Sequence, residues 1–192
     1  MLLNRYLLLG VIFILFVVSC HSGPDRVGVF FRIEVNFTRF ENPQSQTHDG
    51  YYCDSMSACD PQIYAFIELI YEPPASSPKP SEKFVLVHSQ CCANVYNMTT
   101  HNQIVKTICQ VGRHPIPKRV SVKVEVRDKD LFTPNDMIEQ FNCQFPFTPL
   151  RKEPTSWSQD AACQPLHGPH QIRLYYRFRI YSIYSTECFV PF

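Results

Sequence analysis

Apolar and polar residues alternate over several short segments of the chain, which are rich in β-branched and aromatic side chains. Residues 120–126 show the cleanest alternation: the valines point one way, and Ser121, Lys123 and Glu125 point the other. Because successive side chains of a strand face opposite sides of a sheet, this pattern predicts a half-exposed strand of an antiparallel sheet.

Four other segments have the composition of strands. Residues 27–35 alternate and predict the first strand, and residues 63–71 form a nearly continuous apolar run, typical of a strand buried in a sandwich. Residues 84–88 and 104–108 are shorter candidates. Between them, the proline-rich residues 73–80 cannot pair inside a sheet and predict an exposed loop.

Two segments near the end of the chain allow more than one interpretation. Residues 135–147 fit either a helical turn or a strand that begins after Asp136. Residues 172–183 alternate, except at Tyr175 and Tyr176, where the break is compatible with a β-bulge. Their arginines form either a basic-aromatic binding face or the solvated face of an ordinary strand. These arginines are Arg173, Arg177 and Arg179.

Six to eight short strands separated by turn signals, with no long stretch of helical period, predict an all-β fold with negligible helix. The expected architecture is a two-sheet antiparallel β-sandwich. We find no internal repeat, and residues 23–192 have the size of one domain.

Residues 1–22 predict a signal peptide. Arg5 supplies the positive charge, residues 6–18 form the apolar run, and small residues allow cleavage after Ser22. The alternative is an uncleaved membrane anchor, but this run is shorter than the roughly 20 apolar residues of a spanning helix. We therefore expect a secreted, extracellular protein.

The charge balance and motifs limit the functional classes. Of 18 Lys and Arg, 17 remain without Arg5, against 17 Asp and Glu, so the mature chain is close to neutral. Nucleic-acid binding is not expected, because it needs a clustered basic face. No nucleophile elbow, zinc-protease motif or phosphate loop is present, so we expect no enzyme. His167-Gly-Pro-His170 reads as a turn rather than half of a metal site, since no further ligand has compatible spacing.

Eight of the nine cysteines lie beyond the signal peptide, and an even number in a secreted chain predicts a disulfide framework. We expect all eight to be oxidised, and the adjacent Cys91 and Cys92 to bond to different partners rather than to hold a metal. Asn36 and Asn97 lie in glycosylation triplets, which predicts surface positions for both. The eight cysteines are Cys53, Cys59, Cys91, Cys92, Cys109, Cys143, Cys163 and Cys188.

Two loops next to predicted strands carry aspartates. Asp54 and Asp60 precede the strand that starts near residue 63, and Asp128, Asp130 and Asp136 follow the valine-rich strand. Calcium prefers six to eight oxygen ligands on flexible loops, so two such loops at one edge of a sandwich predict a calcium site. The alternative is that these aspartates only shape turns, where Asp is common.

Both loops resemble those of C2 domains. That family carries two aspartates six apart before a proline, as at Asp54 and Asp60. It also carries aspartates at relative positions 0, 2 and 8 after a valine-rich strand, as at Asp128, Asp130 and Asp136. The resemblance covers about residues 27–147. It implies a C2-like sandwich that binds calcium between apical loops and so docks on phospholipid.

A second resemblance covers more of the chain. The N-terminal module of Notch ligands, itself C2-like, has landmarks similar to G-Y-Y-C-D at residues 50–54 and C-D-P-Q-I-Y at residues 59–64. Residues 124–128, 135–138 and 173–188 match its later segments. The cysteine-rich receptor-binding module and the EGF repeats of a full ligand do not follow, so we expect a stand-alone relative or a truncated isoform.

Three functions follow from these patterns. The first is a secreted C2-like module, related to Notch ligands, that binds calcium and docks on a phospholipid membrane surface or a cell-surface receptor. The second is a metal-free extracellular interaction module. The third is a cysteine-rich secreted effector such as an inhibitor or a toxin.

Overall fold

A computed structural model describes residues 28–53, 58–72, 82–87, 94–99, 101–111, 115–130, 135–149, 156–167 and 171–189. They form strands and one short 3₁₀ helix, and every strand pair is antiparallel. The predicted all-β class is confirmed. The elements are β1 (Gly28–Glu41), β2 (Pro61–Ile70), β3 (Glu82–Val87), β4 (Val95–Asn97), β5 (Gln103–Val111), β6 (Arg119–Asp128), β7 (Met137–Pro146), β8 (Ala161–Ala162), β9 (Gln164–Pro165), β10 (Arg173–Ser182) and η1 (Ser185–Phe189).

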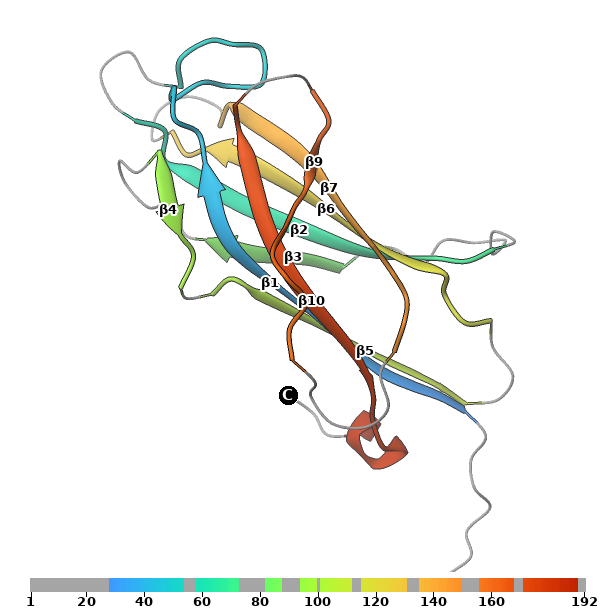
Figure 1. The fold of residues 1–192 in the computed structure, drawn as a ribbon. Coiled ribbons are helices and arrows are strands. Elements are labelled where there is room, and N and C mark those ends of the chain that lie inside the picture. The colour runs from blue at the N-terminus through green and yellow to red at the C-terminus, as the bar shows by residue number, and fades with distance from the viewer. Residues whose placement is uncertain are drawn as a thin grey trace, which may run out of the picture.

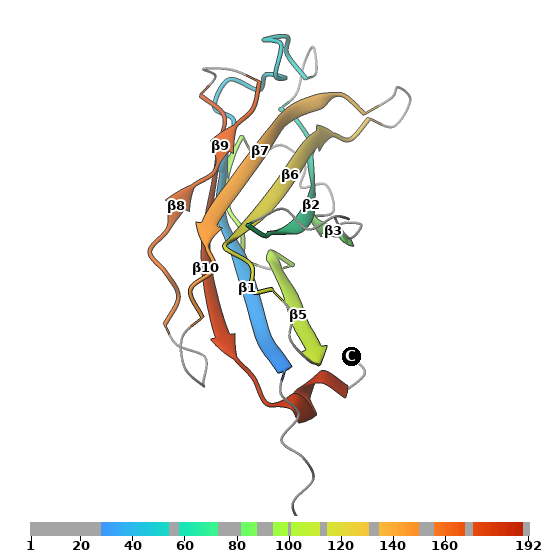
Figure 2. The same cartoon turned by 90° about the vertical axis from the view of Figure 1, so that its right-hand side faces the viewer.

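The strands form two sheets that face each other (Figures 1 and 2). In the first sheet β1 pairs with β10 on one side, β5 and β4 pair with successive parts of its other side, and β8 adds to β10. The second sheet has the order β3-β2-β6-β7-β9. The two-sheet antiparallel sandwich is therefore confirmed, although sequence patterns did not predict the short strands β4, β8 and β9.

The valine-rich strand β6 lies at the centre of the second sheet. Val120, Val122, Val124 and Val126 are all buried, as their alternation predicts, and Lys123 on the opposite face is exposed. The inward residues of β2 are buried too, whereas its other residues are only half-buried. The apolar run at β2 thus belongs to a strand with one buried face rather than two.

Both sheets contain β-bulges, where the register between two paired strands shifts. The register of β1 against β10 shifts between Phe37 and Arg39, opposite Tyr176 and Tyr175. The break in alternation at these tyrosines thus coincides with a bulge, although the extra residue is in the partner strand.

Residues 137–146 form the strand β7, so the strand interpretation of this segment is correct and the helical turn is wrong.

Aromatic side chains join the two sheets across the core. The rings of Phe145 in β7 and Phe178 in β10 stack with centroids 3.9 Å apart. The Tyr176 hydroxyl donates a hydrogen bond of 3.0 Å to the carbonyl of Gln144 in the opposite sheet, and burial raises the pKa of Tyr176. A buried tyrosine needs such a partner for its hydroxyl, and this one fixes the spacing of the sheets.

A cluster of polar and aromatic side chains covers part of the outer face of the first sheet. Glu34, which is 6% exposed, accepts hydrogen bonds from Arg179 at 2.6 Å and from the Tyr181 hydroxyl at 2.6 Å. Burial, and then the hydrogen bond to Glu34, raise the pKa of Tyr181. Arg177 and Arg179 both lie over the ring of Trp157, 5.1 and 4.5 Å from its centroid. Arg179 is therefore packed and paired and Arg177 is packed on the same ring, which argues against a free basic-aromatic binding face.

Three disulfides staple the described part of the chain: Cys53–Cys59, Cys109–Cys188 and Cys143–Cys163. They account for six of the eight expected cysteines. Cys91 and Cys92 lie outside the described residues. The expectation that these two bond to different partners therefore stays a prediction.

The predictions for residues 1–22 and 73–80 concern segments outside the described residues. In the part of the chain that the structure describes, no helix has the length and apolar character needed to cross a membrane.

The disulfides differ in the length of chain that they close, 79 residues for Cys109–Cys188 and 6 for Cys53–Cys59. In the chain-entropy account, the longer loop contributes about 4.5 kcal/mol to the free energy of unfolding and the shorter about 2 kcal/mol. We predict that replacing both cysteines of a pair by alanine costs more stability for Cys109 and Cys188 than for Cys53 and Cys59. Denaturant unfolding measures both costs, and the reverse order would contradict this account.

Candidate functional site

The two acidic loops lie at the same end of the sandwich. Pro61, at the start of β2, pairs with Asp128, at the end of β6, and the Lys129 amide donates to the Asp60 carbonyl at 3.0 Å. The Asp128 amide donates to the Asp136 carbonyl at 2.8 Å. We call this the apical end; it is the upper end of the molecule in Figures 1 and 2. The sequence prediction that two loops meet at one edge is therefore confirmed for these residues.

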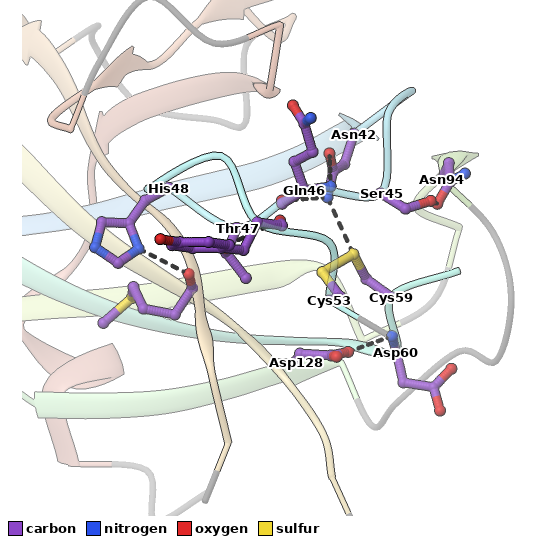
Figure 3. Close-up of a disulfide and its surroundings, with 12 residues drawn as sticks. Asn42, Ser45, Gln46, Thr47, His48, Cys53, Cys59, Asp60, Asn94 and Asp128 are labelled. Atoms are coloured by element: carbon purple, nitrogen blue, oxygen red, sulfur yellow. Dashed lines mark hydrogen bonds between the residues drawn. A yellow bond between two sulfur atoms is a disulfide. The ribbon is translucent and has the colours of Figure 1, made fainter. Parts of the chain in front are cut away.

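The aspartate side chains differ in position. Asp128 is 1% exposed, and its Oδ1 accepts the amide hydrogen of Asp60 at 2.5 Å. The carboxylate of Asp60 points away from that of Asp128 (Figure 3). Asp130 is half-buried and Asp136 is exposed, and the Asp130 amide donates to Asn135 Oδ1 at 3.3 Å. Asp128 is thus a structural cap of the apical end, whereas Asp60, Asp130 and Asp136 offer accessible oxygens.

A compact loop, residues 42–53, lies beside these aspartates and is held from within (Figure 3). The buried Asn42 donates through Nδ2 to the Gln46 carbonyl at 2.9 Å and to Cys59 Sγ at 3.2 Å, and its Oδ1 accepts the Gln46 amide at 3.2 Å. The Cys53–Cys59 disulfide then joins this loop to the start of β2. One buried amide and one disulfide therefore fix the loop against the acidic end.

Two aromatic side chains project from the tip of this loop. Tyr51 is 74% exposed and Tyr52 is 69% exposed, while Gly50 before them has a positive φ of 87°. The turn is closed by hydrogen bonds between Thr47 and the residues 50 and 51. Sequence reasoning noted these tyrosines only as part of a resemblance and did not predict their exposure.

The calcium prediction can be compared with this geometry only in part, because Asp54 lies outside the described residues. Among the residues that the structure does describe, no three His, Cys, Asp or Glu side chains are grouped so as to hold a metal ion. The four described aspartates share one end through their backbones, but their carboxylates do not converge. Calcium binding therefore stays a prediction.

The two glycosylation triplets differ in accessibility. Asn97 in β4 is exposed, as expected. Asn36 is only 9% exposed, because β1 places it between Arg177 of β10 and Gln103 of β5. The expected surface position is wrong for Asn36, since a triplet carries no information about which strand of a sheet is central.

Comparison with solved structures identifies the fold. A crystal structure of a C2 domain protein from Ramazzottius varieornatus is 26% identical, with a TM-score of 0.68, and the match covers 86% of this chain and 96% of that one. A structure of Drosophila C2-DSL-EGF1 is 14% identical over 79% of this chain and 67% of that one, with a TM-score of 0.49. A C2 domain of plant Extended Synaptotagmin 1 is 11% identical over 80% of this chain and 95% of that one, with a TM-score of 0.48.

The chain is thus a C2-like domain, as its acidic loops suggested. No protein-family profile matches it, and no curated protein is similar to it in sequence.

The capping role of Asp128 is testable without calcium. We predict that Asp128→Ala lowers the free energy of unfolding by about 1–3 kcal/mol, because the Asp60 amide loses its acceptor. Asp128→Asn is the matched control, since it keeps an oxygen at the same place and should cost less. Denaturant unfolding in the presence of a chelator measures both, and equal stability of wild type and Asp128→Ala would rule out the cap.

Proposed function

We propose that this chain is a secreted C2-like docking module whose apical end attaches to a phospholipid surface, with calcium in the acidic loops promoting attachment. The observation that carries the proposal is the placement of accessible acidic groups and two exposed tyrosines at one end of a rigid sandwich. The disulfides fit an oxidising, extracellular compartment. Nothing in this role requires catalysis.

The accessible aspartates supply the chemistry that calcium prefers. Carboxylate oxygens of Asp60, Asp130 and Asp136 are hard ligands on loops, and Asp54 belongs to the same loop as Asp60. A divalent ion would reduce the repulsion between these negative groups. It would also keep coordination positions for lipid phosphate oxygens, because calcium takes six to eight ligands. Extracellular modules bind calcium with dissociation constants of about 10⁻⁴–10⁻³ M.

The exposed tyrosines supply the second contact. Tyrosine combines an apolar ring with a polar hydroxyl and is enriched at membrane–water interfaces. Tyr51 and Tyr52 expose most of their surface at the tip of a loop that a disulfide holds in place. Calcium would therefore control the charge of the apical end, while the tyrosines contact the lipid headgroup region.

The second candidate is a metal-free interaction module that presents the apical end to a cell-surface receptor. It is favoured by the capping role of Asp128, whose carboxylate is committed to the Asp60 amide. The same exposed tyrosines would then serve as anchors in a protein interface, where tyrosine is also enriched.

Asp130→Asn tests the calcium step. The substitution keeps the shape of the side chain but removes one charge, so we predict weaker calcium binding and weaker calcium-dependent co-sedimentation with anionic liposomes. Glu68→Gln is the matched control: it removes one charge from β2 near its other end, where Glu68 pairs with Lys123. Calorimetry and co-sedimentation in millimolar calcium measure the effect. A wild type without calcium heat or calcium-dependent sedimentation would favour the metal-free module instead.

Tyr51→Ser combined with Tyr52→Ser separates docking from calcium binding. We predict that this variant keeps the calcium affinity of the wild type and loses most of its liposome binding, because only the aromatic contact has been removed. The same calorimetric and co-sedimentation assays apply. Unchanged liposome binding would show that the tyrosines are not part of the docking surface.

A further inference from the structure

Two histidines from distant parts of the sequence lie side by side near the apical end. His48 belongs to the loop after β1, and His167 follows β9. Their ring centroids are 4.9 Å apart with an interplanar angle of 70°. His48 is half-buried and the side chain of His167 is 36% exposed, so solvent reaches the pair.

Each imidazole is oriented through the same ring nitrogen. His48 Nδ1 lies 2.9 Å from the carbonyl oxygen of Met137, and His167 Nδ1 lies 3.1 Å from Glu139 Oε1 (the His48 bond is dashed in Figure 3). Because a carbonyl and a carboxylate only accept hydrogen bonds, both Nδ1 atoms donate. The lone pair of each neutral ring is therefore on Nε2, which has no hydrogen-bond partner among the described residues.

The carboxyl group behind His167 is an unusual feature of the core. Glu139 pairs with Val126 in the regular register of β7, on the same inward face as Phe141 and Cys143, and it is 0% exposed. Its Oε1 accepts from the Gln140 amide at 2.8 Å and from the amide and ring of His167, both at 3.1 Å. Its Oε2 has no partner among the described residues. Burying a carboxylate is costly unless a positive group faces it.

We propose that His48 and His167 bind a divalent transition-metal ion of the zinc and copper type through their Nε2 atoms. A metal-ligating histidine almost always donates its other N–H to a carboxylate or a backbone carbonyl, and this pair has one of each. A tetrahedral zinc ion with bonds of about 2.0–2.1 Å needs nitrogens about 3.3 Å apart, a separation within the range open to two rings whose centroids are 4.9 Å apart. The ion also supplies the positive charge that Glu139 lacks, and water completes its coordination.

This site differs from the proposed calcium site in its chemistry. Imidazole suits zinc and copper, whereas calcium takes oxygen ligands, so neither ion should displace the other. The described residues offer no third His, Cys, Asp or Glu ligand, in keeping with a two-histidine site open to solvent. The sequence did not reveal it because His48 and His167 are brought together only by the fold.

Zinc calorimetry on the untagged protein tests the proposal. We predict one zinc ion per chain, with the binding heat lost in His48→Ala and in His167→Ala. His101→Asn is the matched control: it removes an exposed histidine of another loop, and asparagine tolerates its positive φ of 52°. Asp130→Asn, which tests the calcium proposal, should leave zinc binding unchanged. Zinc binding that survives both histidine substitutions, or no zinc binding by wild type, would overturn the site.

A second measurement uses the wild type without metal and therefore does not depend on whether the histidine variants fold. In the wild type without metal, long-range ¹H–¹⁵N correlation spectra should show His48 and His167 as the tautomer protonated at Nδ1, and zinc should shift both Nε2 resonances. Glu139→Gln should weaken zinc binding by about 10–100-fold, because it removes the charged acceptor behind His167. Protonation at Nε2 in either apo ring, or Nε2 resonances that zinc does not move, would refute the proposal.

Discussion

The register of β6 between β2 and β7 is the constraint on which the rest of the structure depends. It places the valines of β6 inward, where they are part of the hydrophobic core. The same register brings Asp128 against Pro61, and so to the Asp60 amide. A slip of one residue would expose the valines and separate the acidic loops, since side chains alternate with period two. Burial of apolar surface therefore also assembles the apical end.

Much of the fold follows from local pattern. The strands β1, β6 and β10 alternate, β2 is a nearly continuous apolar run, and all four are rich in β-branched or aromatic residues, so their existence was predictable from the sequence. The meeting of the two acidic loops was predictable as well, through the likeness to C2 domains. The strands β4, β8 and β9 were not, because two or three residues are too few to show a period.

The details that give the apical end its chemistry depend on long-range contacts. Glu139 alternates with the buried Phe141 and Cys143 on the inward face of β7, and its partner His167 lies 28 residues further along the chain. Asp128, a predicted calcium ligand, also acts as a cap, because the turn before β2 leaves the Asp60 amide in need of an acceptor. His167 gains its neighbour His48 only when both loops close over the same edge.

The most direct test of the central claim is a calcium titration of the ¹⁵N-labelled protein followed by amide chemical shifts. If the apical acidic groups bind calcium, saturable shifts at millimolar calcium should be concentrated at Asp60, Lys129, Asp130 and Asp136 and at the loop of residues 42–53. The β5 strand and η1, at the other end of the first sheet, should be unaffected (Figure 2). An absence of shifts at millimolar calcium, or shifts confined to that other end, would contradict the account.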